Sequence, residues 1–175
     1  MFCKFLNFPQ VPVNLTDKLS VGEIIGTYPS RTCVREQQEF VVSGGVYYRT
    51  AQDINDWVKD NINVDLDFVG VRYQYGTPIQ SAHGPHSDAT RSWALLYTVD
   101  NANGKINFWQ EKGQLLERSR ATLISDYDTL QNLAQYETPN GVWYLVNGQV
   151  IHSVEDMTRT RCTLQVNLKS LRGLE

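Results

Sequence analysis

The sequence predicts a mainly β fold, a double-sheet jelly roll or barrel with a few helices packed outside it. From residue 64 onward apolar residues recur with a period of two, which is typical of strands. Turn sequences such as Asp100-Asn-Ala-Asn-Gly104 separate these runs, and many short strands with few helices favour two packed sheets. The 175 residues, 41% of them hydrophobic, fit one domain over 1–175, with a helical or irregular flank at 1–62 and a β core at 64–168.

Helical patterns are confined to the first third of the chain. Residues 15–25 form a weak candidate helix, and residues 51–62 form a stronger one. Thr50 occupies the expected N-cap position, with Asp53 three residues later. Apolar residues then recur at helical spacing, at Ile54, Trp57, Val58 and Ile62. We expect this helix to pack one face on a sheet.

The strand candidates begin with the alternating residues of 64–68 and 71–75. Further candidates are residues 93–99, 106–109, 143–146, 149–154 and 163–168. Asn147-Gly148 stands between two of these runs, and this dipeptide favours a tight type I′ hairpin. The prediction places His152 on the returning strand of that hairpin.

Composition excludes several classes of function. Sixteen basic and nineteen acidic residues give a net charge of −3 without a basic stripe, so we expect no nucleic-acid partner. No apolar run approaches the roughly 20 residues of a membrane-spanning helix, so we expect no membrane partner. Cys3, Cys33 and Cys162 are an odd set without Cys-x-x-Cys spacing, which favours reduced thiols. With an N-terminus unlike a secretory signal, the expected location is the cytoplasm.

Three histidines provide the strongest chemical signal. His86 and Asp88 are separated by one residue, and side chains at i and i+2 share a face of an extended segment. His152 arrives from a distant strand. Two histidines and one carboxylate form the facial triad of non-heme Fe(II) oxygenases, although His-x-Asp alone is common by chance.

An arginine after the last histidine strengthens this hypothesis. Arg161 lies nine residues after His152 and two before Thr163, at the start of an apolar strand. An arginine that points into a barrel needs an anion, and the far carboxylate of a dicarboxylic cosubstrate provides one. Arg159 lies on the same face of an ideal strand as Arg161, so it stays an alternative for this role. The simpler interpretation of Arg159 is a surface arginine at the start of a strand.

These motifs together resemble the Fe(II)- and 2-oxoglutarate-dependent dioxygenases, in particular the compact members similar to prolyl 4-hydroxylases. The resemblance covers residues 64–168 and rests on the order His-x-Asp, His, then Arg-x-Thr. It implies a double-stranded β-helix of the jelly-roll or cupin-like type. It also implies that Fe(II) is bound by His86, Asp88 and His152, that Arg161 and Thr163 hold the distal carboxylate of 2-oxoglutarate, and that ascorbate serves as an optional reductant.

The resemblance further implies that the Tyr73 hydroxyl reaches the same carboxylate, with Tyr75 competing for this role. The implied reaction hydroxylates a C–H bond, of a peptidyl proline or another amino-acid side chain, and releases succinate and CO2. The partner is then a small-molecule or peptide substrate, and the chain a monomer or homodimer. His83, Arg91 and Trp93 are candidates for contacting substrate or orienting the ligands.

Two other readings stay open. One is a jelly-roll module that binds a metal or a sugar without turnover. The other is a cupin-like metalloenzyme that uses oxygen without 2-oxoglutarate, in which His83 would have to be a ligand as well.

Overall fold

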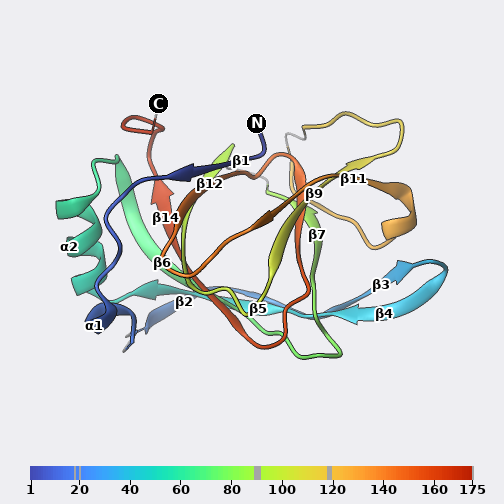
Figure 1. The fold of residues 1–175 in the computed structure, drawn as a ribbon, viewed down its shortest axis with the longest axis horizontal. Helices are drawn as coiled ribbons and strands as arrows, with labels where there is room; N and C mark the ends of the chain where they lie inside the picture. Colours follow the sequence, from blue (N-terminus) through green and yellow to red (C-terminus); the bar gives the residue numbers. More distant parts are fainter. Residues whose placement is uncertain (18, 20, 89–91, 118–119, 175) are drawn as a thin grey trace.

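Two antiparallel sheets and a separate hairpin make up the fold of the computed structural model, which describes residues 1–17, 19, 21–88, 92–117 and 120–174 (Figure 1). The larger sheet has seven strands in the order β1-β12-β8-β14-β6-β5-β2. Their bounds in that order are Cys3–Leu6, Trp143–Asn147, Trp93–Asp100, Arg161–Leu168, Leu66–Gln74, Gly45–Thr50 and Val21–Tyr28. The mainly β jelly-roll class predicted from the sequence is confirmed.

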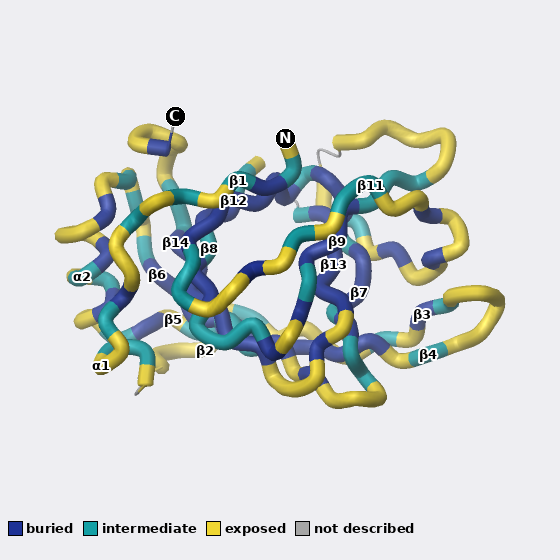
Figure 2. Tube along the Cα trace, viewed as in Figure 1, coloured by how far each residue is buried: buried dark blue, intermediate teal, exposed yellow. Residues whose placement is uncertain are grey.

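The smaller sheet has five strands in the order β10-β7-β13-β9-β11. Their bounds in that order are Thr122–Leu123, His83–Ser87, Ile151–Glu155, Lys105–Glu111 and Leu130–Glu137. The hairpin of β3 (Arg31–Arg35) and β4 (Gln38–Val42) extends beside this sheet, and its tip is exposed (Figure 2). Its inner side packs with the short helix η1 (Tyr127–Thr129) in a cluster that contains Cys33, Val42 and Tyr127.

Two helices lie beside the seven-stranded sheet, α1 (Val13–Thr16) and α2 (Gln52–Asn61). The predicted helix over 51–62 is confirmed, and Ile54 and Val58 bury its apolar face against the sheet. Thr50 is not its N-cap, because that position belongs to Ala51 and the Thr50 hydroxyl donates to the Val69 carbonyl instead (3.0 Å). Neither helix has the length and hydropathy needed to cross a membrane, a result that applies to the described residues.

The first third of the chain differs most from its prediction. The expected helix over 15–25 is wrong, because α1 ends at Thr16 and residues 21–28 form β2, which pairs with β5. Two glycines and β-branched residues in Val21-Gly-Glu-Ile-Ile-Gly26 disfavour a helix and suit this edge strand. Residues 1–62 contain five strands, so the expectation of a helical or irregular flank is also wrong for these segments.

The predicted hairpin at Asn147-Gly148 does not form. β12 pairs with β1 and β8 in one sheet, whereas β13 pairs with β7 and β9 in the other, so this segment crosses between the sheets. Neither residue has the positive φ that a type I′ turn requires. Instead the Asn147 Oδ1 accepts the Gln149 N–H (3.1 Å). The positive φ angles of a two-residue hairpin occur at Glu36 (52°) and Gln37 (62°), between β3 and β4.

Strand β14 has one apolar and one polar face, and this difference locates the functional site. Cys162, Leu164 and Val166 belong to the large apolar cluster that α2 covers. The alternate residues Arg161, Thr163 and Gln165 are also buried, but they face the space between the two sheets. A sheet face that buries polar side chains away from the apolar core is a candidate binding surface.

Candidate metal centre

Sheet pairing brings His86 and His152 together. The two residues are direct partners across β7 and β13, and their ring centroids are 4.4 Å apart. His86 Nδ1 lies 3.0 Å from the Gly84 carbonyl oxygen, and His152 Nδ1 lies 2.9 Å from that of Val150. A carbonyl only accepts hydrogen bonds, so each Nδ1 is the protonated donor and each Nε2 keeps its lone pair for a metal.

Asp88 completes a set of three ligands. One ligand atom from each of His86, Asp88 and His152 lies within 4.8 Å of the others. Asp88 follows directly after β7, and its N–H donates to the Gly148 carbonyl (2.7 Å). The segment that crosses between the sheets after β12 therefore fixes the backbone that carries the carboxylate.

His83 lies close to this group but outside it. It pairs with Val154 while His86 pairs with His152, so β7 carries one extra residue and forms a β-bulge. The bulge places the His83 ring 5.2 Å from the His86 ring, and its Nδ1 lies 3.3 Å from the Ser43 carbonyl oxygen. Burial lowers the pKa of His83 to about 3 and holds the pKa of His86 well below its usual value, so both rings are neutral at pH 7.

Arg161 is a buried cation whose described partners are all neutral. Only 2% of the residue is exposed, and it donates to Gln74 Oε1 (2.7 Å), Tyr144 Oη (2.7 Å) and Thr138 Oγ1 (3.4 Å). Its Nε is buried without a hydrogen-bond partner in the described part of the chain. No described acidic side chain forms an ion pair with it. A buried guanidinium in this setting is incomplete without an anion.

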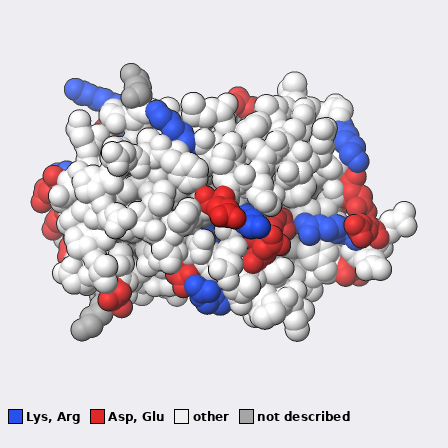
Figure 3. Space-filling view, viewed as in Figure 1, with Lys and Arg blue, Asp and Glu red and all other residues white. Residues whose placement is uncertain are grey.

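Arg159, the alternative to Arg161, is a surface residue. Its Nη2 forms an ion pair with the Asp100 carboxylate (2.7 Å), and 54% of its side chain is exposed. Basic and acidic side chains lie next to one another at several places on the face shown in Figure 3. The structure therefore separates the two arginines that the sequence left as alternatives.

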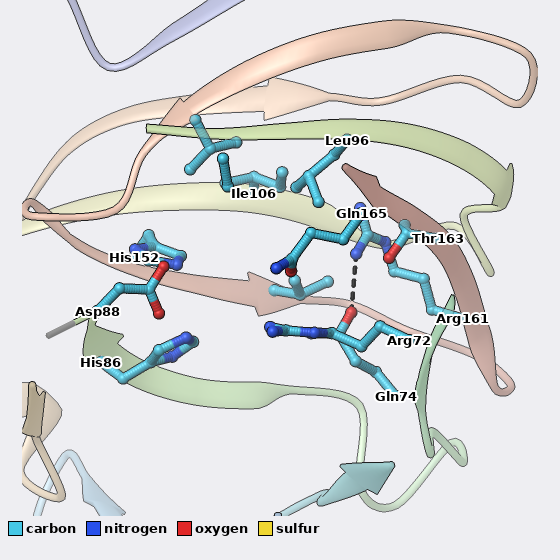
Figure 4. A pocket seen from close by; sticks show the side chains of 13 residues that line it. Arg72, Gln74, His86, Asp88, Leu96, Ile106, His152, Arg161, Thr163 and Gln165 are labelled. Atoms are coloured by element: carbon cyan, nitrogen blue, oxygen red, sulfur yellow. Dashed lines mark hydrogen bonds between the residues drawn. The ribbon is translucent and has the colours of Figure 1, made fainter. Parts of the chain in front are cut away.

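The three metal-ligand candidates and Arg161 line one cavity between the sheets (Figure 4). Its volume is about 40 Å³, with the histidines at one end and Arg161, Thr163 and Gln74 at the other. A second pocket of about 310 Å³ adjoins it, and the two share Arg72, His86 and Asp88. The arrangement offers a metal site between a narrow polar end and a wider opening.

Other residues singled out in the sequence lie elsewhere. Tyr73 does not line this cavity, because it occupies the face of β6 opposite Arg72 and packs on the large core beside Cys162. The predicted contact between the Tyr73 hydroxyl and the cosubstrate is therefore wrong for this cavity. Tyr75 is half exposed, and Trp93 packs on the same core. Arg91 lies outside the described residues.

Three polar cavity residues escaped the sequence analysis: Arg72, Gln74 and Gln165. Arg72 pairs with Thr163 across β6 and β14, and its Nε is buried with no hydrogen-bond partner among the described residues. In the sequence these residues are only the polar positions of two alternating strands, and such positions are usually assigned to solvent. The apolar positions of both strands face the core under α2, and the cavity lies on the other face.

The residues present fit a divalent iron ion and a dicarboxylate. Two imidazoles with oriented Nε2 atoms and one carboxylate are the donor set of non-heme Fe(II) sites. The unpaired Nε atom of Arg161 shows that the polar end lacks an acceptor among the described residues, and a carboxylate supplies one.

No family model and no curated protein sequence matches the chain. Solved structures do match in fold. A Pseudomonas putida prolyl-4-hydroxylase aligns with a TM-score of 0.46 and 12% identity over 96% of this chain and 93% of that one. E. coli ycfD aligns with the same TM-score and identity over 99% and 51%, and vicilin from Corylus avellana with 0.40 and 16% over 73% and 30%. The chain thus spans about half the length of ycfD. These similarities concern the fold.

Proposed function

We propose that this chain is an Fe(II)- and 2-oxoglutarate-dependent dioxygenase that hydroxylates a C–H bond. One observation carries the proposal: a histidine–carboxylate–histidine group and a buried arginine with no acidic partner among the described residues line the same cavity. A metal-binding module without turnover explains the first feature and gives no reason for the second.

His86, Asp88 and His152 would hold the ion on one side and leave its other positions open. When bound, Fe(II) with 2-oxoglutarate supplies an oxygen-activating centre, and the overall reaction turns substrate, 2-oxoglutarate and O2 into hydroxylated substrate, succinate and CO2. The bonds from Nδ1 to the Gly84 and Val150 carbonyls hold both rings in the ligating orientation and fix the tautomer.

Arg161 would bind the distal carboxylate of 2-oxoglutarate, with Thr163 beside it on the same face of β14. The Tyr144 hydroxyl and the Gln74 amide oxygen hold the guanidinium in place. Because the cavity has a volume of only about 40 Å³, we expect the Gln74 side chain to give up its contact with Arg161 when the carboxylate enters.

Apolar side chains exclude water between the two ends of the cavity. Leu96 comes from the large sheet, and Ile106 and Val154 come from the small one. A dry wall of this kind strengthens the ionic contact at Arg161 and protects the reacting centre from side reactions. The substrate is a peptidyl proline or another amino-acid side chain, presented by a peptide or small molecule.

The test is an anaerobic titration of metal-free protein with Fe(II) and then 2-oxoglutarate. We expect a visible charge-transfer band from the chelated 2-oxo acid, lost in His86→Ala and weakened in Arg161→Ala. Arg159→Ala is the matched control, because this arginine is paired at the surface. If iron binds and no band develops, the 2-oxoglutarate proposal fails and the binding module or a cupin-like oxygenase takes its place.

A further inference from the structure

The pocket of about 310 Å³ beside the metal ligands carries information about the substrate. This volume lies at the small end of ligand sites and suits one small molecule or one inserted side chain. Its wall is partly apolar, from Tyr28, Pro29, Ala121 and Leu123. Its charged groups are Arg31, Arg72 and Asp88, of which Asp88 belongs to the proposed metal site.

Arg31 has a structural role that leaves its charge in place. It donates to the main-chain carbonyls of Ile124 (2.7 Å) and Pro85 (2.7 Å), and so attaches β3 to β7 and to the residue that follows β10. Carbonyl partners do not neutralise a guanidinium. No acidic side chain in the described ranges forms an ion pair with Arg31.

Arg72 lies at the boundary of the two cavities and lines both of them. Tyrosine rings hold its guanidinium, with its carbon 5.3 Å from the ring centroid of Tyr28 and 5.2 Å from that of Tyr47. Gly70 makes this possible, because a Cβ at this position would overlap the Tyr47 ring. The Arg72 Nε is nevertheless buried without a partner, and no described carboxylate pairs with the side chain.

A fixed guanidinium with unused donors is suited to a carboxylate, which accepts two parallel hydrogen bonds from it. We infer that the substrate carries a carboxylate that binds Arg72 and an apolar part that fills the pocket under Tyr28 and Leu123. The inference rests on the proposed function, since it treats this pocket as the substrate side of the metal site. The carboxylate comes from a free acid or from an acidic side chain of a peptide, and both present the same chemistry to Arg72.

Calorimetry with matched probes tests this assignment. The probes are 3-phenylpropionate and its neutral amide, and the pentapeptide acetyl-Ala-Ala-Glu-Ala-Ala-amide with its Gln counterpart. Each is titrated into protein loaded anaerobically with Fe(II) and saturating 2-oxoglutarate, and into metal-free protein. We expect the carboxylate of at least one pair to bind about tenfold or more tighter than its neutral analogue. The pair that binds identifies the source of the carboxylate.

Arg72→Gln should abolish this preference, whereas Arg161→Gln should weaken 2-oxoglutarate binding and leave the preference in metal-free protein. Equal binding of both members in both pairs overturns the inference. A preference lost in Arg161→Gln and kept in Arg72→Gln also overturns it, as does loss of 2-oxoglutarate binding in Arg72→Gln. If the wild type binds the carboxylate probe but neither Fe(II) nor 2-oxoglutarate, the proposed function fails and the anion site stands.

Discussion

His86 and His152 are direct cross-strand partners, and each uses its Nδ1 in the same way, on the carbonyl two residues earlier in its own strand or turn. The repeated bond leaves both Nε2 atoms as lone-pair donors on the inner face of the small sheet. The pairing of β7 with β13 therefore builds the metal site, because it brings together two histidines that are 66 positions apart in sequence.

Asp88→Ala is expected to reduce Fe(II) affinity by about 100-fold or more. Even the loss of a residue that only hydrogen-bonds to a metal ligand typically lowers metal affinity by about 10–100-fold, and Asp88 is itself a proposed ligand. Titration with Fe(II) or Co(II), followed by absorption, measures the change. His83→Ala is the matched control, because His83 lies outside the group of three. Equal losses in both variants would place His83 among the ligands and favour a cupin-like site.

Arg161→Lys is expected to raise the Kd for 2-oxoglutarate about tenfold, and Arg161→Met about 30-fold or more. Lysine keeps the charge but cannot form the two parallel bonds of a guanidinium. Fe(II) affinity should stay unchanged in both variants, because Arg161 lies at the end of the cavity away from the ligands. The prediction fails if both variants bind 2-oxoglutarate like the wild type.

Much of the β core was predictable because its strands have simple apolar patterns. In the runs that became β6, β9 and β14, apolar residues alternate with polar ones over most of the strand, whereas the runs that became β8 and β12 are nearly continuously apolar. The predicted triad also depended on local geometry, since Asp88 follows His86 by two residues in an extended segment.

The remaining features depend on long-range contacts that no local pattern contains. Asn147-Gly148 has the composition of a hairpin, but its flanking strands find partners in different sheets. Arg72 occupies the polar side of an alternating strand, which sequence patterns assign to solvent. The inner face of the sheet is polar here because it lines the cavity between the sheets. The rule that polar positions of a strand face solvent therefore places Arg72 on the wrong side of the sheet.

Acid should destabilise the metal-free protein through its half-buried, neutral histidines. Burial lowers the pKa of His83 from 6.5 to about 3, so in this range the unfolded chain binds a proton that the folded chain does not. Stability therefore falls as the pH decreases from 6.5 toward 3. Melting temperatures measured with a chelator present should show this slope, and His83→Gln should flatten part of it. A slope unchanged in His83→Gln would show that other groups cause the acid sensitivity.

The β3–β4 hairpin provides the last prediction. Its two turn residues, Glu36 and Gln37, have positive φ angles, a conformation that is unfavourable for both residue types. The Asp128 carboxylate stabilises the turn by accepting the N–H groups of Glu36 (2.7 Å) and Gln37 (3.0 Å). These bonds, that of Gln37 first, lower the pKa of Asp128, so their contribution is present at neutral pH and lost as the pH falls through this pKa.

Asp128→Ala should therefore loosen the hairpin and increase hydrogen exchange of the amides in β3 and β4. Because Arg31 attaches β3 to Pro85, the same variant should also increase exchange in β7 next to the metal ligands. The double substitution Glu36→Asn with Gln37→Gly, which suits a type I′ turn, should restore protection in the Asp128→Ala background. Unchanged exchange in Asp128→Ala, or no rescue by the new turn, would show that side-chain packing around Tyr127 holds the hairpin without this carboxylate.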